Sequence, residues 1–382
     1  MMHRNLIAVS TVLILAAVVL GACGPAATPT TTAGADAPVS LAAGSVKING
    51  AGATFPLPVY TEWTYAYQYV DPSVVLNYQG IGSGGGKKAI IDNTVDFAGS
   101  DSLLSADEYT AGKDLQMYPM LAGAVVPIYN ISFQGLADGT KPATLILDRA
   151  TLVGIYNGTI TKWNDPAITA LNPDLAANLP DAGITAVHRS DGSGTTEIFT
   201  KSLTSFSPDW TAGGASAVEW PVDKAGNGIG AKGNPGVAAS VQNTPNSIGY
   251  VELSYALSNG ITFADMINKA GNKVTANADS LSSDMADFAN AFDDKLNATI
   301  VDGGGANSWP IAGYTYLVLH TTSMTDCVKA QKLLDYIHWT LTDPAAAQRA
   351  SDLGYSVLPG AVQKLVLDKL SQVTCNGKPV MQ

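Results

Sequence analysis

Short apolar runs alternate with segments of helical spacing along most of the chain, beginning near residue 46. Residues 46–48 and 74–78 are predicted strands, and 95–97 is expected to be extended. Near the carboxyl end, residues 314–320 have the continuous apolar character of a buried strand. The strand signals are therefore spread over the whole chain rather than gathered in one part of it.

Helices are predicted between these strands, where apolar residues recur at spacings of three and four. One such face consists of Val59, Trp63, Tyr67 and Val70. Residues 87–91 and 327–341 are also predicted helical, and Ser105 with Glu108 has the spacing of a capping box. Strands that alternate with helices predict an α/β fold with mostly parallel sheets flanked by helices.

The first residues have a different character and are expected to lie outside the fold. Arg4 precedes an apolar run at 6–20, which is short for a membrane span and typical of a signal peptide. Leu20-Gly21-Ala22-Cys23 resembles the lipobox of bacterial lipoproteins, in which the cysteine carries lipid. We therefore expect a signal peptide at 1–22, lipidation at Cys23 and a flexible tether at 23–44. The alternative is an ordinary secretory signal with an incidental cysteine.

Length and composition narrow the class of protein. The 382 residues suit two domains, and 46% apolar with 14% charged residues is not the composition of a disordered chain. A net charge of −11 argues against nucleic acid and anionic membrane surfaces as partners. It does not exclude a small anion, because local backbone dipoles can outweigh a distant net charge. Beyond Cys23 there are Cys327 and Cys375, which outside the cytoplasm are either a disulfide or two unpaired buried thiols.

Three glycine-rich segments carry the candidate chemistry, each placed before a predicted helix. In the first, at 51–56, Thr54 is the expected N-cap and Pro56 an early helical residue, so free N–H groups would face any ligand in front of them. The second, at 80–87, has the glycines that allow close backbone approach but lacks the spacing of a Walker loop. Taken singly, the first could be a capped helix with nothing bound and the second a surface loop.

The third segment, at 189–196, also combines glycines with hydroxyl residues, and it adds the positive charge of an arginine. Arg189 can form bidentate bonds to a tetrahedral oxyanion, and Asp191 is close enough to orient its guanidinium. Neither Ser83 nor Ser193 lies in the G-x-S-x-G pattern of an esterase. Together the three segments predict an oxyanion held by several helix N-termini with few formal charges.

An aspartate, Asp101, lies between the second and third segments. A carboxylate can accept a hydrogen bond from a protonated phosphate oxygen, whereas fully ionised sulfate has no proton to offer. A buried unpaired acceptor costs about 1–3 kcal/mol, which is enough to discriminate between the two anions. The alternative is a solvated acid at the start of a helix.

These stretches also resemble a known family. GAGATFP, YQGIGSGGG, VDFAGSD and RSDGSGTT, followed by NSIGYVE and WPI, are similar in sequence and order to the phosphate-binding proteins of the bacterial phosphate-specific ABC transport system. The resemblance implies a two-lobed, Venus-flytrap fold of the type II periplasmic binding proteins, with phosphate in the cleft. It implies one lobe from residues 45–130 and 309–382, and a second from 131–308.

The resemblance also implies ligands, carried over by motif. The phosphate-binding residues would be Thr54, Phe55, Ser83, Asp101, Arg189, Ser193, Gly194 and Thr195, with Asp191 in support. It implies inorganic phosphate and an ABC permease complex as partners, a location outside the cytoplasm on a lipid anchor, no cofactor or metal, and no enzymatic activity.

Three alternatives remain. A secreted phosphohydrolase would need a metal cluster or an activated nucleophile, and the histidines of the chain are scattered. A binding protein for another tetrahedral oxyanion is disfavoured by Asp101. A surface adhesion or sensor protein could keep the fold without transport.

Overall fold

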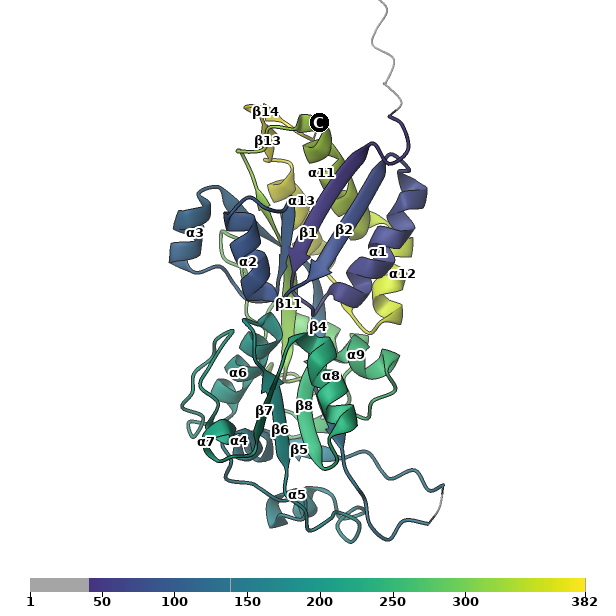
Figure 1. The fold of residues 1–382 in the computed structure, drawn as a ribbon, viewed down its shortest axis with the longest axis vertical. Coiled ribbons are helices and arrows are strands. Elements are labelled where there is room, and N and C mark those ends of the chain that lie inside the picture. Colours follow the sequence, from purple (N-terminus) through teal and green to yellow (C-terminus); the bar gives the residue numbers. More distant parts are fainter. Residues whose placement is uncertain (1–40, 138, 382) are drawn as a thin grey trace, which may run out of the picture. The chain divides into compact units, whose positions relative to one another are not determined.

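The computed structural model describes residues 41–137 and 139–381 (Figure 1). The predicted signal peptide at 1–22, the predicted lipidation site Cys23 and most of the predicted tether lie outside the described residues. Residues 41–382 group into one unit of contacts, and the elements below belong to it.

One mixed sheet runs through this unit in the order β2-β1-β3-β11-β4-β8-β6-β7. We divide this sheet within β4 into a first half-sheet, from β2 to β11, and a second, from β8 to β7. The first half-sheet contains three parallel strands, β2 (Val74–Gly80), β1 (Val46–Gly52) and β3 (Phe97–Ser100). Strand β11 (Ala312–His320) pairs antiparallel with β3, and β4 (Leu115–Asn130) pairs antiparallel with β11. The expected α/β class is confirmed, with parallel pairing in the outer strands and antiparallel pairing in the middle.

Strand β4 is shared by both halves of the sheet. Its residues Leu115 to Ala124 pair with β11, and Val125 to Asn130 pair with β8 (Ser247–Glu252). The second half-sheet continues from β8 to the parallel strands β6 (Thr185–Arg189) and β7 (Gly228–Ala231). All residues of β4 except the last are buried, as expected for a strand covered on both faces.

Shorter strands complete the architecture. The short β12 (Ser356–Val357) pairs with β4 at its midpoint. A small sheet contains β10 (Lys273–Val274), β9 (Asp265–Ile267) and β5 (Ile146–Asp148), and a hairpin contains β13 (Thr374–Cys375) and β14 (Lys378–Pro379).

Helices cover both faces of each half-sheet (Figure 1). Because β1 lies between β2 and β3, right-handed crossovers place α1 and α2 on opposite faces, and the same reasoning separates α6 from α8. The helices are α1 (Leu57–Val70), α2 (Ser83–Ile91), α3 (Ala106–Gly112), α4 (Arg149–Tyr156), α5 (Pro166–Leu171), α6 (Gly194–Phe206), α7 (Pro221–Lys224), α8 (Gly233–Asn243), α9 (Leu253–Ser258), α10 (Ala278–Asp287), α11 (Cys327–Thr342), α12 (Pro344–Asp352) and α13 (Gly360–Leu370).

Several local predictions are confirmed. Helix α1 buries Val59, Trp63 and Tyr67 of the predicted face, whereas Val70, at its last position, is exposed. Trp63 donates a hydrogen bond to the carbonyl of Ala346 in α12. Ser105 and Glu108 form the predicted capping box of α3. Helix α2 begins earlier than predicted, at Ser83, and includes three glycines. A Cβ on Gly86 would lie 2.5 Å from the Cα of Gly52, so glycine allows α2 to pack directly against β1.

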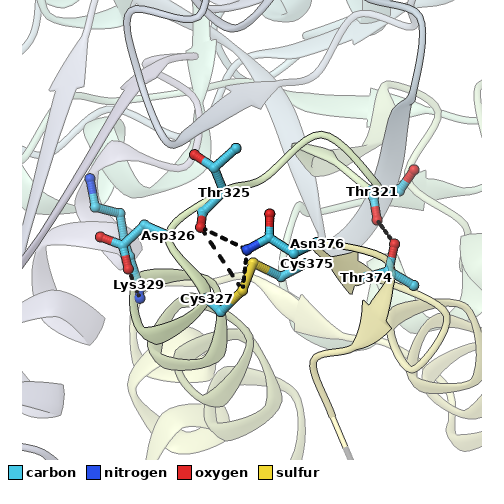
Figure 2. Close-up of a disulfide and its surroundings, with 8 residues drawn as sticks. All are labelled: Thr321, Thr325, Asp326, Cys327, Lys329, Thr374, Cys375 and Asn376. Carbon is cyan, nitrogen blue, oxygen red and sulfur yellow. Dashed lines mark hydrogen bonds between the residues drawn. A yellow bond between two sulfur atoms is a disulfide. The ribbon is translucent and has the colours of Figure 1, made fainter.

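Cys327 and Cys375, the expected pair, form a disulfide in the structure (Figure 2). The bond joins the first residue of α11 to β13 across 48 positions of sequence. The chain between the two cysteines contains α11, α12 and α13. The bond therefore connects the carboxyl-terminal hairpin to the start of α11.

Candidate anion-binding site

The three glycine-rich segments meet at the junction of the two half-sheets, where the parallel strands of each half have their carboxyl ends. The first follows β1, the second follows β2, and the third joins β6 to α6. The Gly84 N–H donates to the Gly192 carbonyl at 3.0 Å, and the Gly194 N–H donates to Ser83 Oγ at 3.1 Å. Ligands of open α/β sheets bind at such carboxyl ends, so the fold places the segments where a ligand site is expected.

The first segment presents its N–H groups in an orientation fixed by tyrosines. The carbonyl oxygens of Ala53, Thr54 and Phe55 each accept a hydrogen bond from a tyrosine hydroxyl. The donors are Tyr78, Tyr255 and Tyr355, respectively. In the described part of the chain, the N–H groups of Thr54 and Phe55 have no hydrogen-bond partner, so both are free to donate to a ligand.

The predicted N-cap role of Thr54 is wrong. Helix α1 begins at Leu57, Pro56 occupies the cap position, and no side chain caps the helix. The Thr54 hydroxyl instead accepts hydrogen bonds from Asn234 across the junction of the half-sheets. A long-range partner has replaced the local interaction that sequence rules favour.

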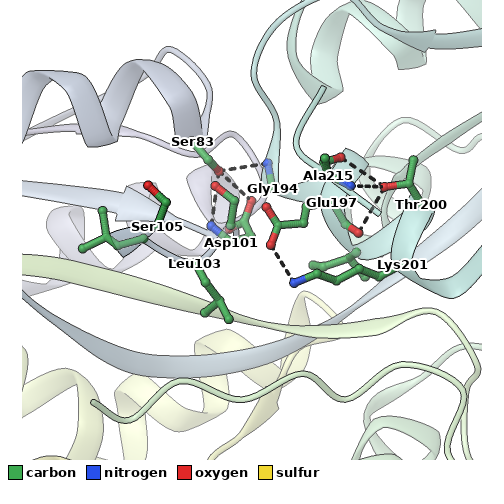
Figure 3. A network of polar contacts seen from close by, with 12 residues as sticks. Ser83, Asp101, Leu103, Ser105, Gly194, Glu197, Thr200, Lys201 and Ala215 are labelled. Atoms are coloured by element: carbon green, nitrogen blue, oxygen red, sulfur yellow. Dashed lines mark hydrogen bonds and ion pairs between the residues drawn. The ribbon is translucent and has the colours of Figure 1, made fainter. Parts of the chain in front are cut away.

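Ser83 links the second and third segments (Figure 3). Its hydroxyl accepts from the N–H groups of Asp101 and Gly194, at 3.2 and 3.1 Å, and donates to Asp101 Oδ2 at 3.3 Å. The hydroxyl is therefore fully engaged by the protein, and it would have to exchange one of these partners to bind a ligand directly.

Asp101 is buried directly after β3, with 5% of its surface exposed. Its Oδ1 accepts a hydrogen bond from the Thr315 hydroxyl at 2.8 Å. Burial raises the pKa of Asp101 to about 7, although hydrogen bonds from Thr315 and Ser83 and the charge of Arg189 act in the opposite direction. The carboxyl group can therefore exchange a proton near neutral pH, unlike an exposed aspartate.

Arg189, at the end of β6, has one half of its guanidinium held and the other half free. Its Nε and Nη2 donate to the two carboxylate oxygens of Asp191, at 2.7 and 2.6 Å. Burial opposes the ionisation of Asp191, but these bonds and the charge of Arg189 hold its pKa below the usual value. Its Nη1 is buried and has no hydrogen-bond partner among the described residues. A buried charged donor without a partner is costly, and an oxyanion would satisfy it.

The remaining predicted residues, Ser193, Gly194 and Thr195, lie at the start of α6. The Ser193 hydroxyl caps the helix by accepting from the Thr196 N–H, and Thr195 Oγ1 accepts from Asn234. A Cβ on Gly194 would lie 2.5 Å from the Cβ of Asp101, so any side chain there would push the two segments apart. Thr54, Phe55, Ser83, Asp101, Arg189, Asp191, Ser193, Gly194 and Thr195 thus all lie in one region.

Sequence reasoning missed the residues that support this region, namely the three tyrosines of the first segment, Asn234 and Thr315. Thr315 gives no local signal, since it lies within the buried strand β11. Asn234 follows Gly233 at the start of α8, a fourth glycine-containing helix start that the same criterion could have found. Within the described residues, no group of three or more His, Cys, Asp or Glu side chains is arranged to hold a metal ion. No helix there has both the length and the apolar character that crossing a membrane requires.

The family profile and the related sequences that match this chain agree on one family. The profile of the PBP superfamily domain matches residues 26–344. The phosphate-binding protein PstS of Xylella fastidiosa is 39% identical over 326 residues, covering 84% of each chain. That of Pasteurella multocida is 38% identical over 343 residues, covering 88% of this chain and 93% of its own.

Solved structures agree with the fold. A high-affinity periplasmic phosphate-binding protein solved with phosphate has a TM-score of 0.67 at 21% identity, covering 84% of this chain and 93% of its own. A phosphate-binding protein from Stenotrophomonas maltophilia has a TM-score of 0.61 at 22% identity, covering 84% and 92%. The fold is thus that of the two-lobed periplasmic binding proteins, and the chain belongs to the PBP superfamily and, within it, to the PstS-like family of phosphate-binding proteins.

Proposed function

We propose that this protein captures inorganic phosphate outside the cytoplasm and delivers it to an ABC importer. The observation that carries the proposal is the buried Nη1 of Arg189, which has no hydrogen-bond partner among the described residues and whose charge acts on Asp101. The site offers many donors and one carboxyl group of pKa about 7, a pattern suited to a tetrahedral oxyanion that carries a proton. Relatives named as PstS phosphate-binding proteins support the same ligand.

The ligand residues we propose are Thr54, Phe55, Ser83, Asp101, Arg189, Ser193, Gly194 and Thr195. Those of the first and second segments, with Asp101, come from the first half-sheet, and the others come from the second. Phosphate would bridge the two lobes, taken as 45–130 with 309–382 and 131–308. The direct contacts of Ser83 with Gly194 and of Thr54 with Asn234 support a closed arrangement in which such bridging occurs.

Asp101 is the proposed selector between phosphate and sulfate. Its carboxylate would accept a hydrogen bond from a protonated phosphate oxygen, whereas fully ionised sulfate has no proton to donate and would place a charged oxygen against the carboxylate. Its burial makes this mismatch expensive, because solvent is not there to compensate.

Calorimetric titration with phosphate and with sulfate, at equal concentration and pH, tests the ligand. We expect tight phosphate binding and sulfate binding weaker by at least about tenfold, the size of one lost charged hydrogen bond. Equal affinities, or no phosphate binding, would refute the proposal.

Membrane anchoring at Cys23 is a separate part of the proposal and rests on the lipobox-like Leu20-Gly21-Ala22-Cys23. Expression of the full chain and of Cys23→Ser in a bacterium, followed by fractionation, tests it. Wild-type protein should remain with membranes and the variant should be released. Release of both would leave an ordinary secretory signal as the explanation.

A further inference from the structure

We propose that Asn234 is a positioning residue that aims the hydroxyl protons of Thr54 and Thr195 at the bound anion. This inference rests on the proposed phosphate function and goes beyond it by naming what orients two of its donors. Asn234 is the second residue of α8 and is fully buried. Its Nδ2 donates to Thr54 Oγ1 at 3.0 Å and to Thr195 Oγ1 at 3.1 Å, and so joins the two half-sheets.

The orientation of the Asn234 amide is fixed by its other end. The backbone N–H of Glu252 is buried and lies 3.1 Å from Asn234 Oδ1. A donor there requires the carbonyl oxygen of the amide, so the NH2 group must face the two threonines. Both hydrogens of that group are then used, one for each hydroxyl.

This arrangement leaves the Thr54 hydroxyl free to act only as a hydrogen-bond donor. A hydroxyl has two acceptor lone pairs and one proton. The Asn234 backbone N–H, at 3.1 Å, and its Nδ2 both donate to Thr54 Oγ1, and together they fill the two lone pairs. The hydroxyl proton must therefore be donated elsewhere. Among the described residues this hydroxyl has no hydrogen-bond acceptor, and a bound oxyanion would supply one.

The start of α8 also positions Arg189, through Gly233, the residue before Asn234. The Gly233 N–H donates to Asp191 Oδ1 at 3.0 Å, and Asp191 in turn holds the guanidinium. The turn into α8 therefore positions a charged donor and two hydroxyl donors at once. Asn234 itself need not touch the ligand.

Calorimetry with inorganic phosphate on single and double variants tests this role. We expect Asn234→Ala to weaken binding by about tenfold, because two hydroxyls lose their fixed direction. In a Thr54→Val background the same change should cost distinctly less, about threefold, because one of the hydroxyls it orients is already absent. Asn243→Ala, at an exposed position on the same helix, is the matched control and should bind as the wild type does.

An isosteric variant covers the case in which Asn234→Ala does not fold. Asn234→Asp replaces the donor by an acceptor, so the hydroxyl protons should turn inward and phosphate affinity should fall further than in Asn234→Ala. Wild-type affinity in Asn234→Asp, or an equal cost of Asn234→Ala in both backgrounds, would refute the positioning role while leaving phosphate binding intact. Absence of phosphate binding in the wild type would overturn both the proposed function and this inference.

Discussion

Replacing Arg189 by alanine is the sharpest single perturbation of the proposed site. The change removes the buried Nη1, which carries two N–H groups without a partner among the described residues, and it frees Asp191 from its cation. Each charged hydrogen bond contributes about 1.5–3 kcal/mol when its partner is present. One to two such bonds give a loss of about 1.5–6 kcal/mol, which is roughly 10-fold to 10,000-fold in phosphate affinity.

Isothermal titration calorimetry at one pH and one salt concentration measures this loss directly. Arg349→Ala is the matched control, because Arg349 pairs with Glu62 on the surface at 3.1 Å and the substitution changes the net charge equally. Exposed pairs contribute little, so this control should bind as the wild type does.

A double variant separates the two consequences of the substitution. In Arg189→Ala the uncompensated Asp191 repels the anion, so adding Asp191→Asn should restore part of the affinity, whereas a simple loss of packing would not respond to it. If Arg189→Ala, shown to be folded by circular dichroism, bound phosphate as tightly as Arg349→Ala, the guanidinium would not contact the ligand and the assignment of the third segment would be wrong.

Three further outcomes follow from the geometry. Asp101→Asn should reduce the ratio of phosphate to sulfate affinity by about tenfold or more, since the amide can donate to sulfate; an unchanged ratio in paired titrations would remove the selector role. Burial raises the pKa of Glu252 from 4.5 to about 8, so the folded protein holds a proton that the unfolded chain releases, and the free energy of unfolding should fall as pH rises through this window. Glu252→Gln should abolish about 3–4 kcal/mol of that fall in urea titrations from pH 5 to 8, and a parallel pH dependence in variant and wild type would contradict this. Replacing Cys327 and Cys375 by serine should cost about 4 kcal/mol for a loop of 48 positions, matched by reduction of the wild type, and equal denaturation midpoints with and without reductant would count against it.

Local patterns predicted the elements because local physics forms them. The apolar face of α1 and the capping box of α3 are determined by residues three and four positions apart, and both are present in the structure. Arg189 and Asp191 are close in sequence, so their pairing was visible before any fold was known. The hypothesis of an oxyanion site with few charges could therefore be formed from the sequence.

The supporting contacts could not be predicted from local pattern, since they join distant parts of the chain. Asp101 and Thr315 are 214 positions apart, and Thr54 and Asn234 are 180 apart. Thr54 shows the consequence most directly. Sequence preference predicts a helix cap there, but the fold brings a buried amide to the same hydroxyl and the helix starts three residues later, at Leu57.

The pairing of Arg189 with Asp191 also bears on how quickly the ligand arrives. The guanidinium is buried and largely neutralised by its partner, so it projects little attraction into solvent. An approaching anion instead meets a protein of net charge −11, which repels it at long range. Added salt screens that repulsion within a Debye length of about 10 Å at 0.1 M, so the association rate should rise with ionic strength. Capture by this protein would then be fastest in saline surroundings, the reverse of an enzyme that draws its substrate in by opposite charge.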